Sequence, residues 1–289
     1  MRILIVGGGF LVTDLVKELE SENHEILIFT RTPNIYLQSQ QILGDIFNFE
    51  GFVKIFKWNP QVVIHTAWVT TPGMYKSDIS NFQYADFTTK LAQFVVNSDL
   101  EHLIIFGTCA EYGLQSAPSK AGYTKLVPTT LYAQQKVAAL NSVKEVMKGS
   151  NVRLTWARIF HPFGPNQDER RLIPHLISSI KNREQIILAD TTSVYDWITT
   201  RDISSAISWA IRNKLPMEID IGTSFGFTNL ELLKTLEMLM PKELQQSSWE
   251  THSLGPGEVF IADKDSGLFT SGWFAKDTLT TGLKWVLDR

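Results

Sequence analysis

A tyrosine and a lysine stand four residues apart in the segment 132–136, which reads Tyr-Ala-Gln-Gln-Lys. On a helix these two positions lie side by side, and Thr129 or Thr130 just upstream can cap such a helix. A free phenol has a pKa near ~10, which is too high for acid–base work at neutral pH, and a nearby ammonium group lowers it. Tyr132 beside Lys136 therefore predicts proton exchange with a carbonyl or alcohol oxygen while hydride moves. The alternative is a chance spacing on a solvated helix.

A hydroxyl group follows an apolar run further upstream. Leu103–Gly107 is typical of a buried strand, and Thr108 comes directly after it. At the end of a strand this hydroxyl can bind the reacting oxygen, or it can simply bond its own backbone in a turn. Cys109, the single cysteine, has no adjacent histidine to activate it, so we predict a buried, inert thiol. One cysteine also gives neither an internal disulfide nor a cysteine zinc cluster, and we predict no metal site.

The chain opens with a possible phosphate-binding turn. A predicted strand runs into three glycines at 7–9, and a helix follows over Phe10–Leu19. In this order, backbone N–H groups can meet a pyrophosphate at the start of the helix. Val12 stands where a third glycine would allow close packing, so we expect helix and strand to be pushed apart or shifted in register. The alternative is a tight turn that binds nothing.

The second predicted strand ends just before Arg31. No acidic residue is present there to accept a hydrogen bond from the ribose 2′-hydroxyl of NAD. Arg31 can instead pair with the 2′-phosphate of NADP, although it can equally be an exposed loop arginine. We therefore expect NADP, with NAD possible.

The elements that must position these residues alternate between short apolar runs and helical patterns. The helical stretches are Phe10–Leu19, roughly 79–97 and about 130–148. The runs without strict alternation, typical of strands covered on both faces, are Arg2–Val6, Glu25–Thr30, Val62–His65, Leu103–Gly107, Val152–Ile159 and Glu218–Ile221. This order predicts an α/β fold with a doubly wound parallel sheet. We expect a dinucleotide-binding domain over 1–165, to which 195–225 returns, and a smaller substrate lobe made of 166–194 and 226–289.

Composition and charge argue against several classes of function. The chain has 289 residues, 44% of them hydrophobic and 20% charged, which is ordinary for a soluble globular protein. The net charge of −3 offers no basic field for nucleic acid. The apolar runs are far shorter than the ~20 residues of a membrane helix, and the chain starts as a strand rather than a secretory leader. We expect a cytoplasmic enzyme without a membrane or nucleic-acid partner.

With a glycine turn, a threonine ending a strand and Tyr-x-x-x-Lys in this order, the chain resembles the extended short-chain dehydrogenase/reductase family. Within it, the chain is similar to the NAD-dependent epimerase/dehydratase branch that modifies nucleotide sugars, whose fold is Rossmann-type. The segments that carry the resemblance are Gly44-Asp45-Ile46, Val62 to Ala67, Thr108 to Gly113, Arg158 to Pro165, Asp196 to Ile203, Ile221 to Thr223 and Gly272 to Leu283. Each is weak alone, and seven in the right order are strong.

The resemblance implies roles for individual residues. Tyr132 would be the general acid/base, Lys136 would hold the nicotinamide ribose and tune Tyr132, and Thr108 would bind the reacting oxygen. The implied cofactor-binding residues, besides Tyr132, Lys136 and Arg31, are Gly7, Gly9, Phe10, Leu11, Asp45, Ile46, Thr66, Ala67 and Phe160. The implied substrate-binding residues, besides Thr108, are His161, Arg170, Arg171 and Tyr195. A homodimer through the helices near 79–97 and 130–148 is also implied.

Departures from the family pattern refine the expectation. Dehydratases of the family carry Asp-Glu after the threonine, whereas Cys109 and Ala110 stand here, which disfavours 4,6-dehydration. His161 replaces an asparagine, and Tyr195 replaces a phosphate-binding arginine that Arg170 or Arg171 would then substitute. The leading hypothesis is an NAD(P)-dependent reductase or epimerase acting on a nucleotide sugar. The alternatives are a reductase of a non-sugar ketone or aldehyde and a catalytically silent NADP-binding sensor or scaffold.

Overall fold

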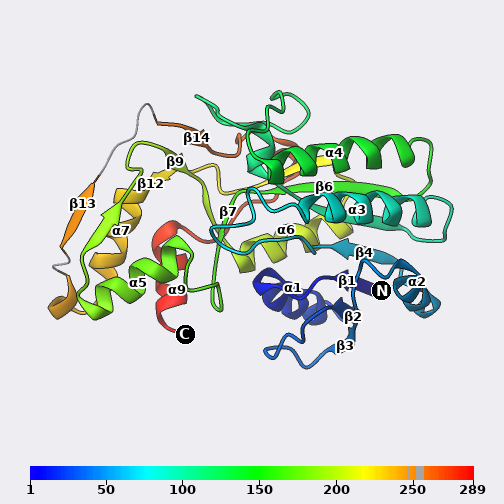
Figure 1. The fold of residues 1–289 in the computed structure, drawn as a ribbon, viewed down its shortest axis with the longest axis horizontal. Coiled ribbons are helices and arrows are strands. Elements are labelled where there is room, and N and C mark those ends of the chain that lie inside the picture. The colour runs from blue at the N-terminus through cyan, green and yellow to red at the C-terminus, as the bar shows by residue number, and fades with distance from the viewer. Residues whose placement is uncertain (246–247, 252–256) are drawn as a thin grey trace.

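The computed structural model describes residues 1–245, 248–251 and 257–289 and consists of a larger and a smaller part (Figure 1). The larger part is built on a seven-stranded sheet in the order β11-β6-β5-β4-β1-β2-β3, in which every neighbouring pair is parallel. Its strands are β1 (Arg2–Val6), β2 (Glu25–Thr30), β3 (Gln40–Leu43), β4 (Val62–His65), β5 (His102–Thr108), β6 (Arg153–Ile159) and β11 (Glu218–Ile221). The predicted α/β fold with a doubly wound parallel sheet is confirmed.

The sequence did not predict the edge strand β3. It contains two glutamines, and only Ile42 and Leu43 are apolar. All four of its residues are partly or fully exposed, because only β2 lies beside it. A strand with one neighbour and little burial lacks the continuous apolar run that marks the central strands.

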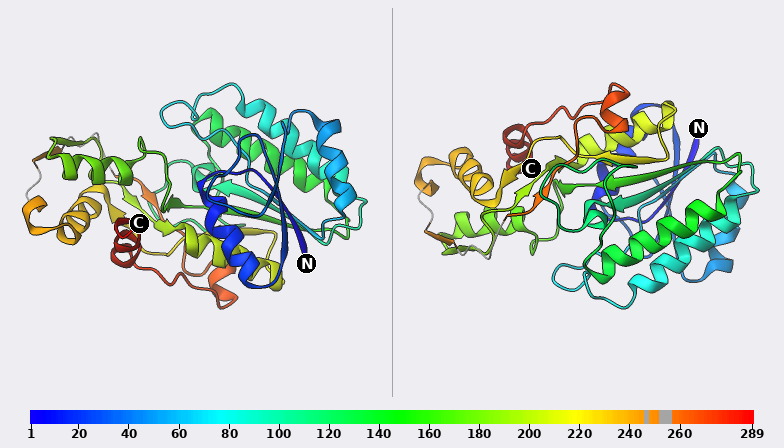
Figure 2. Two further views of the ribbon diagram at one scale, coloured as in Figure 1. Left: turned by 90° about the horizontal axis from the view of Figure 1, so that it is seen from below. Right: turned by 90° about the horizontal axis from the view of Figure 1, so that it is seen from above.

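Helices cover both faces of this sheet, as the two views in Figure 2 show. One face packs against α1 (Phe10–Ser21), α6 (Thr200–Arg212) and α8 (Gly267–Thr270). The other packs against α2 (Phe49–Val53), η1 (Lys54–Trp58), α3 (Asn81–Val95) and α4 (Leu131–Val146). Val12 is wholly buried in the first of these two cores. The side chain at the third glycine position is therefore part of the packing between α1 and the sheet.

The smaller part has a core of its own, formed by residues such as Leu176, Leu233 and Leu283. Its helices are α5 (Leu172–Asn182), α7 (Asn229–Leu239), the short η3 (Lys242–Leu244) and α9 (Leu279–Leu287). Its short strands are β7 (His161–Phe163), β8 (Ile186–Leu188), β9 (Val194–Tyr195), β10 (Trp197–Thr199), β12 (Phe227–Thr228), β13 (Trp249–Thr251) and β14 (Val259–Phe260). Two stretches of the predicted substrate lobe, 246–247 and 252–256, lie outside the described residues.

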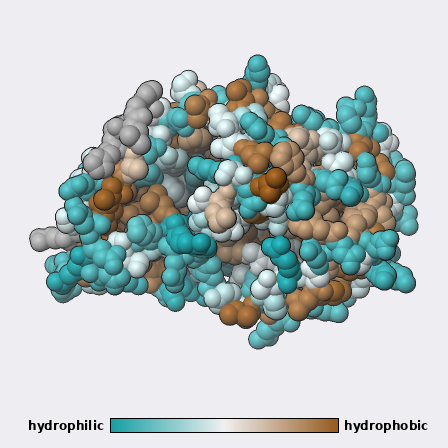
Figure 3. Space-filling view, in the orientation of Figure 1, coloured by the Kyte–Doolittle hydropathy of each residue, from teal (hydrophilic) through white to brown (hydrophobic). Residues whose placement is uncertain are grey.

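The surface mixes polar and apolar side chains. On the face shown in Figure 3, hydrophobic side chains form separate patches among hydrophilic ones. Within the described part of the chain, the helices are all too short or too polar to span a bilayer.

A chain of buried charges fastens β5, β6 and β11 to one another. Arg158, on β6, has no exposed surface and donates from Nε to Glu111 Oε2 at 2.6 Å and from Nη2 to Glu218 Oε2 at 2.6 Å. Lys144, on α4, donates to the other oxygen of Glu218, also at 2.6 Å. Glu111 lies in η2 (Cys109–Tyr112) directly after β5, so this network reaches the segment that follows Thr108.

We expect Arg158→Met to lower the free energy of unfolding by about 3–5 kcal/mol, because it leaves the Glu111 carboxylate buried without its cation. Lys144→Met is the matched control at the outer, part-exposed end of the same network, and its expected cost is about 0–1 kcal/mol. Urea unfolding of both variants measures the difference. Equal losses would contradict the structural role assigned to Arg158.

Candidate active site

The glycine turn and the segment after β4 meet at the carboxyl edge of the sheet. β1 lies between β2 and β4, so the chain leaves β1 toward one side and returns on the other. Such a switch point opens a crevice outside the strand ends, where ligands of doubly wound sheets bind. Thr66 and Ala67 both donate their backbone N–H to the carbonyl of Val6, which holds the two segments side by side.

A cavity of about 750 Å³ occupies this crevice and extends to the smaller part. It is lined by the glycine turn, the ends of β4 and β5, the start of α4 and residues of the smaller part. The predicted site residues that line it are Gly7, Gly9, Phe10, Leu11, Arg31, Asp45, Ile46, Thr66, Ala67, Thr108, Tyr132, Lys136, Phe160, His161, Arg171 and Tyr195. Arg170 does not line it. Its exposed guanidinium pairs with Asp168 Oδ2 at 2.7 Å instead.

The glycine turn at 7–9 exposes backbone groups, without side chains, to the cavity. A Cβ atom on Gly7 would lie 2.4 Å from Thr66 Oγ1, and one on Gly8 would lie 2.5 Å from Thr30 Oγ1. Gly7 also has a φ of 120°, in the region that favours glycine. Gly9 is the N-cap of α1 and has no side chain to occupy the first N–H groups of the helix. These features fit the pyrophosphate of a dinucleotide cofactor.

Arg31 and Asp45 line the same end of the cavity as Tyr84. Burial raises the pKa of the Tyr84 hydroxyl, and the charge of Arg31 and a hydrogen bond with it act in the opposite direction. Arg31 therefore lies at the wall of the cavity, within reach of Tyr84, as an exposed side chain on the loop after β2.

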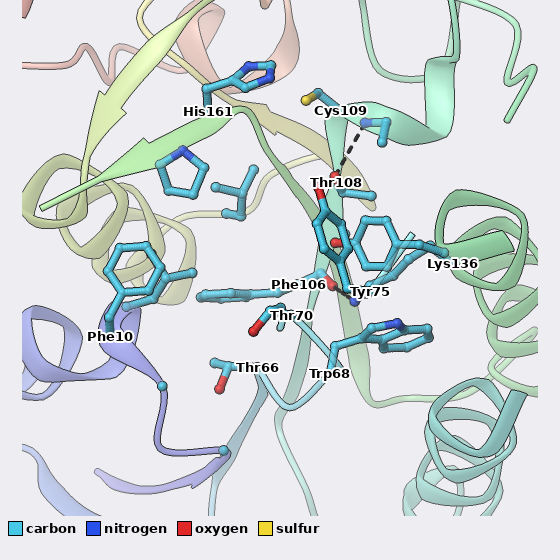
Figure 4. A pocket seen from close by; sticks show the side chains of 18 of the residues that line it. Phe10, Thr66, Trp68, Thr70, Tyr75, Phe106, Thr108, Cys109, Lys136 and His161 are labelled. Carbon is cyan, nitrogen blue, oxygen red and sulfur yellow. Dashed lines mark hydrogen bonds between the residues drawn. The ribbon is translucent and has the colours of Figure 1, made fainter. Parts of the chain in front are cut away.

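Thr108 ends β5 and is held in place by the buried charges described above. Its backbone N–H donates to Glu111 Oε1 at 2.9 Å, and its hydroxyl accepts from the Ala110 N–H at 3.3 Å. Cys109, next in the chain, is buried, as predicted, and burial raises the pKa of its thiol. Figure 4 shows Thr108 and Lys136 on the same side of the pocket.

Tyr132 and Lys136 enter the site from the first turns of α4. Thr130 caps this helix by accepting from the Ala133 N–H at 3.2 Å. The expected lowering of the Tyr132 pKa by Lys136 is wrong, because burial raises this pKa and a hydrogen bond with Thr108 only partly opposes the rise. The Lys136 ammonium instead donates to the Phe106 carbonyl at 2.6 Å, and burial lowers its pKa from 10.5 to about 7.

Aromatic rings form the opposite wall of the cavity. The His161 imidazole packs against both Tyr195 and Trp197, with ring centroids 4.8 Å and 5.4 Å away. Burial lowers the pKa of His161 to about 4, so it is neutral at physiological pH. Tyr195 stacks on Phe260 at 5.4 Å, and its hydroxyl donates to Asp190 Oδ2 at 2.6 Å. The group at the arginine position of the family is therefore a phenol bonded to a carboxylate and adds no positive charge.

Arg171, rather than Arg170, is a cation in this half of the cavity, which Lys76 also lines. It stands at the N-cap of α5 and donates to the Thr70 carbonyl, while its guanidinium lies 5.0 Å from the Tyr75 ring centroid. Tyr75 in turn packs edge-on against Tyr132 at 5.0 Å. Arg171 thus joins the smaller part to the loop after β4 through its contacts with Thr70 and Tyr75.

Sequence reasoning missed the aromatic side chains of that loop. Trp68 and Tyr75 both line the cavity and contact Tyr132 or Lys136. The available signal was position, because Trp68 directly follows Thr66 and Ala67 in a segment already assigned to the cofactor. Nothing in residue type or spacing distinguishes it from a core aromatic. Among the described residues, clusters of three or more potential metal ligands are absent.

Comparison with protein families identifies the family to which the chain belongs. The family described as NAD dependent epimerase/dehydratase matches residues 3–222, which is most of its length. The chain belongs to this family of NAD-dependent enzymes. Among curated proteins, this family member is 21% identical to UDP-glucose 4-epimerase of Lactobacillus helveticus, with 99% of this chain and 97% of that protein covered. It is 24% identical to dTDP-D-glucose 4,6-dehydratase of Bos taurus, with 99% and 88% covered.

Solved structures share the fold over the full chain. UDP-glucose 4-epimerase of Thermotoga maritima, determined with UDP-glucose, has a TM-score of 0.85 at 20% identity, covering 100% of this chain and 98% of that one. dTDP-glucose 4,6-dehydratase of Bacillus anthracis, determined with NAD, has a TM-score of 0.81 at 20% identity, with 100% and 96% covered. Both reaction types therefore occur among the relatives, and this degree of similarity shows the fold of the family member rather than its reaction.

The buried ammonium of Lys136 predicts a pH dependence of stability. Below about pH 7 both the folded and the unfolded chain are protonated here, so the full cost of burying the charge is present. Between that pH and 10.5 the unfolded chain binds one proton more, so stability rises with pH. In this pH range, the free energy of unfolding of the wild type should rise by up to about 1.4 kcal/mol per pH unit relative to that of Lys136→Met. Urea unfolding at a series of pH values measures it, and parallel profiles for the two proteins would contradict the burial of this charge.

Proposed function

We propose that this chain is an NADP-dependent reductase or epimerase that transfers hydride at one carbon of a nucleotide sugar. The observation that carries the proposal is the convergence of Thr108, Tyr132 and Lys136 on one cavity with the glycine turn. A nicotinamide cofactor would supply the hydride donor or acceptor. The residues that fit it are the bare turn at 7–9 for the pyrophosphate and Lys136 for the ribose beside the nicotinamide.

The roles of the chain's own groups follow from their chemistry. The Thr108 hydroxyl binds the oxygen of the reacting carbon, and the backbone bond to Glu111 keeps that hydroxyl at the end of β5. Because burial raises its pKa, Tyr132 holds its proton at neutral pH and is ready to donate it to a carbonyl oxygen. A protonated phenol at this place can donate to a carbonyl oxygen, which is the step required when a ketone is reduced.

The same region argues against 4,6-dehydration. Elimination of water requires a carboxylate and its partner acid beside the sugar, and the two positions after Thr108 hold Cys109 and Ala110. The next residue, Glu111, is a carboxylate, but its oxygens accept from Arg158, Trp156 and the Thr108 backbone. A carboxylate bonded in this way is a structural group.

The preference for NADP rests on Arg31, whose side chain is at the wall of the cavity beyond the glycine turn. Release of oxidised cofactor and rebinding of NADPH would make net reduction the favoured outcome over epimerisation. A reductase of a non-sugar ketone would use the same three catalytic groups, and a silent sensor would need none of them. Single-turnover hydride transfer across a panel of nucleotide 4-keto sugars and simple ketones separates these alternatives.

We expect Tyr132→Phe to lower kcat by about 10²–10⁴-fold, because the general acid is lost, with cofactor binding retained. Single-turnover oxidation of NADPH followed by absorbance measures the rate, and fluorescence titration measures binding. Tyr75→Phe is the matched control, since it removes the hydroxyl of the neighbouring tyrosine in the same cavity and should lower kcat much less. Near-normal turnover by Tyr132→Phe would refute the assigned role.

We expect Arg31→Ala to raise the KM for NADPH by about 10–100-fold, which corresponds to the ~1.5–3 kcal/mol of a hydrogen bond to a charged group. The KM for NADH should change much less, because NADH has no 2′-phosphate. Steady-state kinetics of both proteins with both cofactors provide the comparison. A wild type that clearly prefers NADH would overturn the assignment of Arg31.

A further inference from the structure

Trp68 lies directly beneath the ammonium group of Lys136. Nζ is 3.7 Å from the centroid of the indole ring, and the two residues are only 8% and 3% exposed. Figure 4 shows the end of the Lys136 side chain between the Phe106 carbonyl and the face of Trp68. A buried ammonium must be compensated, and the indole face is the strongest aromatic partner for a cation.

The indole ring is fixed from behind. Its Nε1 donates to Asn81 Oδ1 at 2.7 Å, and its face stacks on Tyr84 with centroids 5.6 Å apart. Asn81 is itself wholly buried, and its Nδ2 donates to the carbonyls of Tyr75 and Asp78 at 2.8 Å and 2.7 Å. The plane of Trp68 is therefore set by α3 and the loop before it, independently of Lys136.

The Lys136 ammonium has three N–H groups, and its neighbours occupy two of the directions in which these groups point. One N–H of Lys136 is used by the Phe106 carbonyl, and the indole covers a second direction. Trp68 also packs edge-on to Tyr132, with centroids 6.4 Å apart. The third direction of the ammonium remains for the cavity, where Tyr132 and the cofactor site lie.

Few other titratable groups act on Lys136. Glu111, beyond β5, favours its charged form, whereas burial opposes it. His65, on β4, is held neutral because burial and the nearby Lys136 charge lower its pKa to about 3. Tyr132, one turn earlier on the same helix, keeps its proton. Because the pKa of Lys136 is about 7, a modest change in its surroundings changes how much of it is charged at physiological pH.

We propose that Trp68 is a positioning residue, whose indole face keeps the Lys136 ammonium charged and directs it into the cavity toward Tyr132 and the cofactor. The consequence for catalysis rests on the proposed function, but the effect on the charge of Lys136 does not. Loss of the indole face favours the neutral amine, which donates a hydrogen bond less strongly to a ribose hydroxyl than an ammonium group does.

The test measures the protonation of Lys136 in the whole protein without substrate. Lysine labelled with carbon-13 at the ε position gives one NMR signal per lysine, and the signal missing from Lys136→Met identifies Lys136. We expect Trp68→Leu to lower the pKa of Lys136 by about one unit, as a desolvated cation–π contact implies, and Trp68→Phe to lower it by less.

A ring-fluorinated tryptophan at position 68 separates electrostatics from packing. Fluorination weakens the negative face of the indole with little change in shape, so the pKa of Lys136 should fall in proportion to the fluorine content. The same substitution at Trp285, which lies against Arg201, is the control and should leave Lys136 unchanged. A Lys136 pKa that does not respond to fluorination at position 68 overturns the proposal, even if Trp68→Leu fails to fold.

The test of Trp68 can fail or succeed independently of the test of the proposed function. A lowered Lys136 pKa in a protein that turns over no ketone would sustain the role of Trp68 and refute the enzymatic reaction. An unchanged pKa in an active enzyme would do the reverse. In an active enzyme, the fluorinated variant should also shift the pH profile of kcat by the amount that NMR measures for Lys136.

Discussion

The constraint on which the site depends is the burial of one ammonium group at the carboxyl edge of a parallel sheet. Lys136 is only 3% exposed, and the groups in contact with its ammonium include the Phe106 carbonyl and the indole of Trp68. Those partners come from the ends of two different elements, β5 and the loop after β4. The position of the Lys136 ammonium in the cavity therefore depends on where β5 and the loop after β4 lie.

The same edge gathers the other groups by topology. The reversal of strand order at β1 brings the glycine turn beside Thr66, and β5 ends at Thr108 two strands away from β1. The Glu111–Arg158–Glu218 network ties the end of β5 to β6 and β11 and so holds Thr108 against the cavity. Stability and site geometry are therefore served by the same buried charges.

Much of this arrangement was predictable from the sequence, because central parallel strands are continuous apolar runs and the motif residues follow them directly. β1, β2 and β4 begin and end where predicted, and the glycine turn, Thr108 and the Tyr-x-x-x-Lys pair fall at the ends or starts of elements. β3 was not predictable, since an edge strand needs no apolar run. The raised pKa of Tyr132, the outward-turned Arg170 and the place of Trp68 depend on tertiary contacts that spacing along the chain does not encode.

The proposed chemistry requires that this cavity holds a nicotinamide dinucleotide against Thr108, Tyr132 and Lys136. A crystal structure of the protein grown with NADPH is the decisive measurement. We expect the pyrophosphate at the glycine turn, the ribose next to the nicotinamide within hydrogen-bonding distance of Lys136, and the nicotinamide ring facing Tyr132. A dinucleotide bound elsewhere, or a cavity that closes over Tyr132 and excludes the dinucleotide, would refute the proposed chemistry.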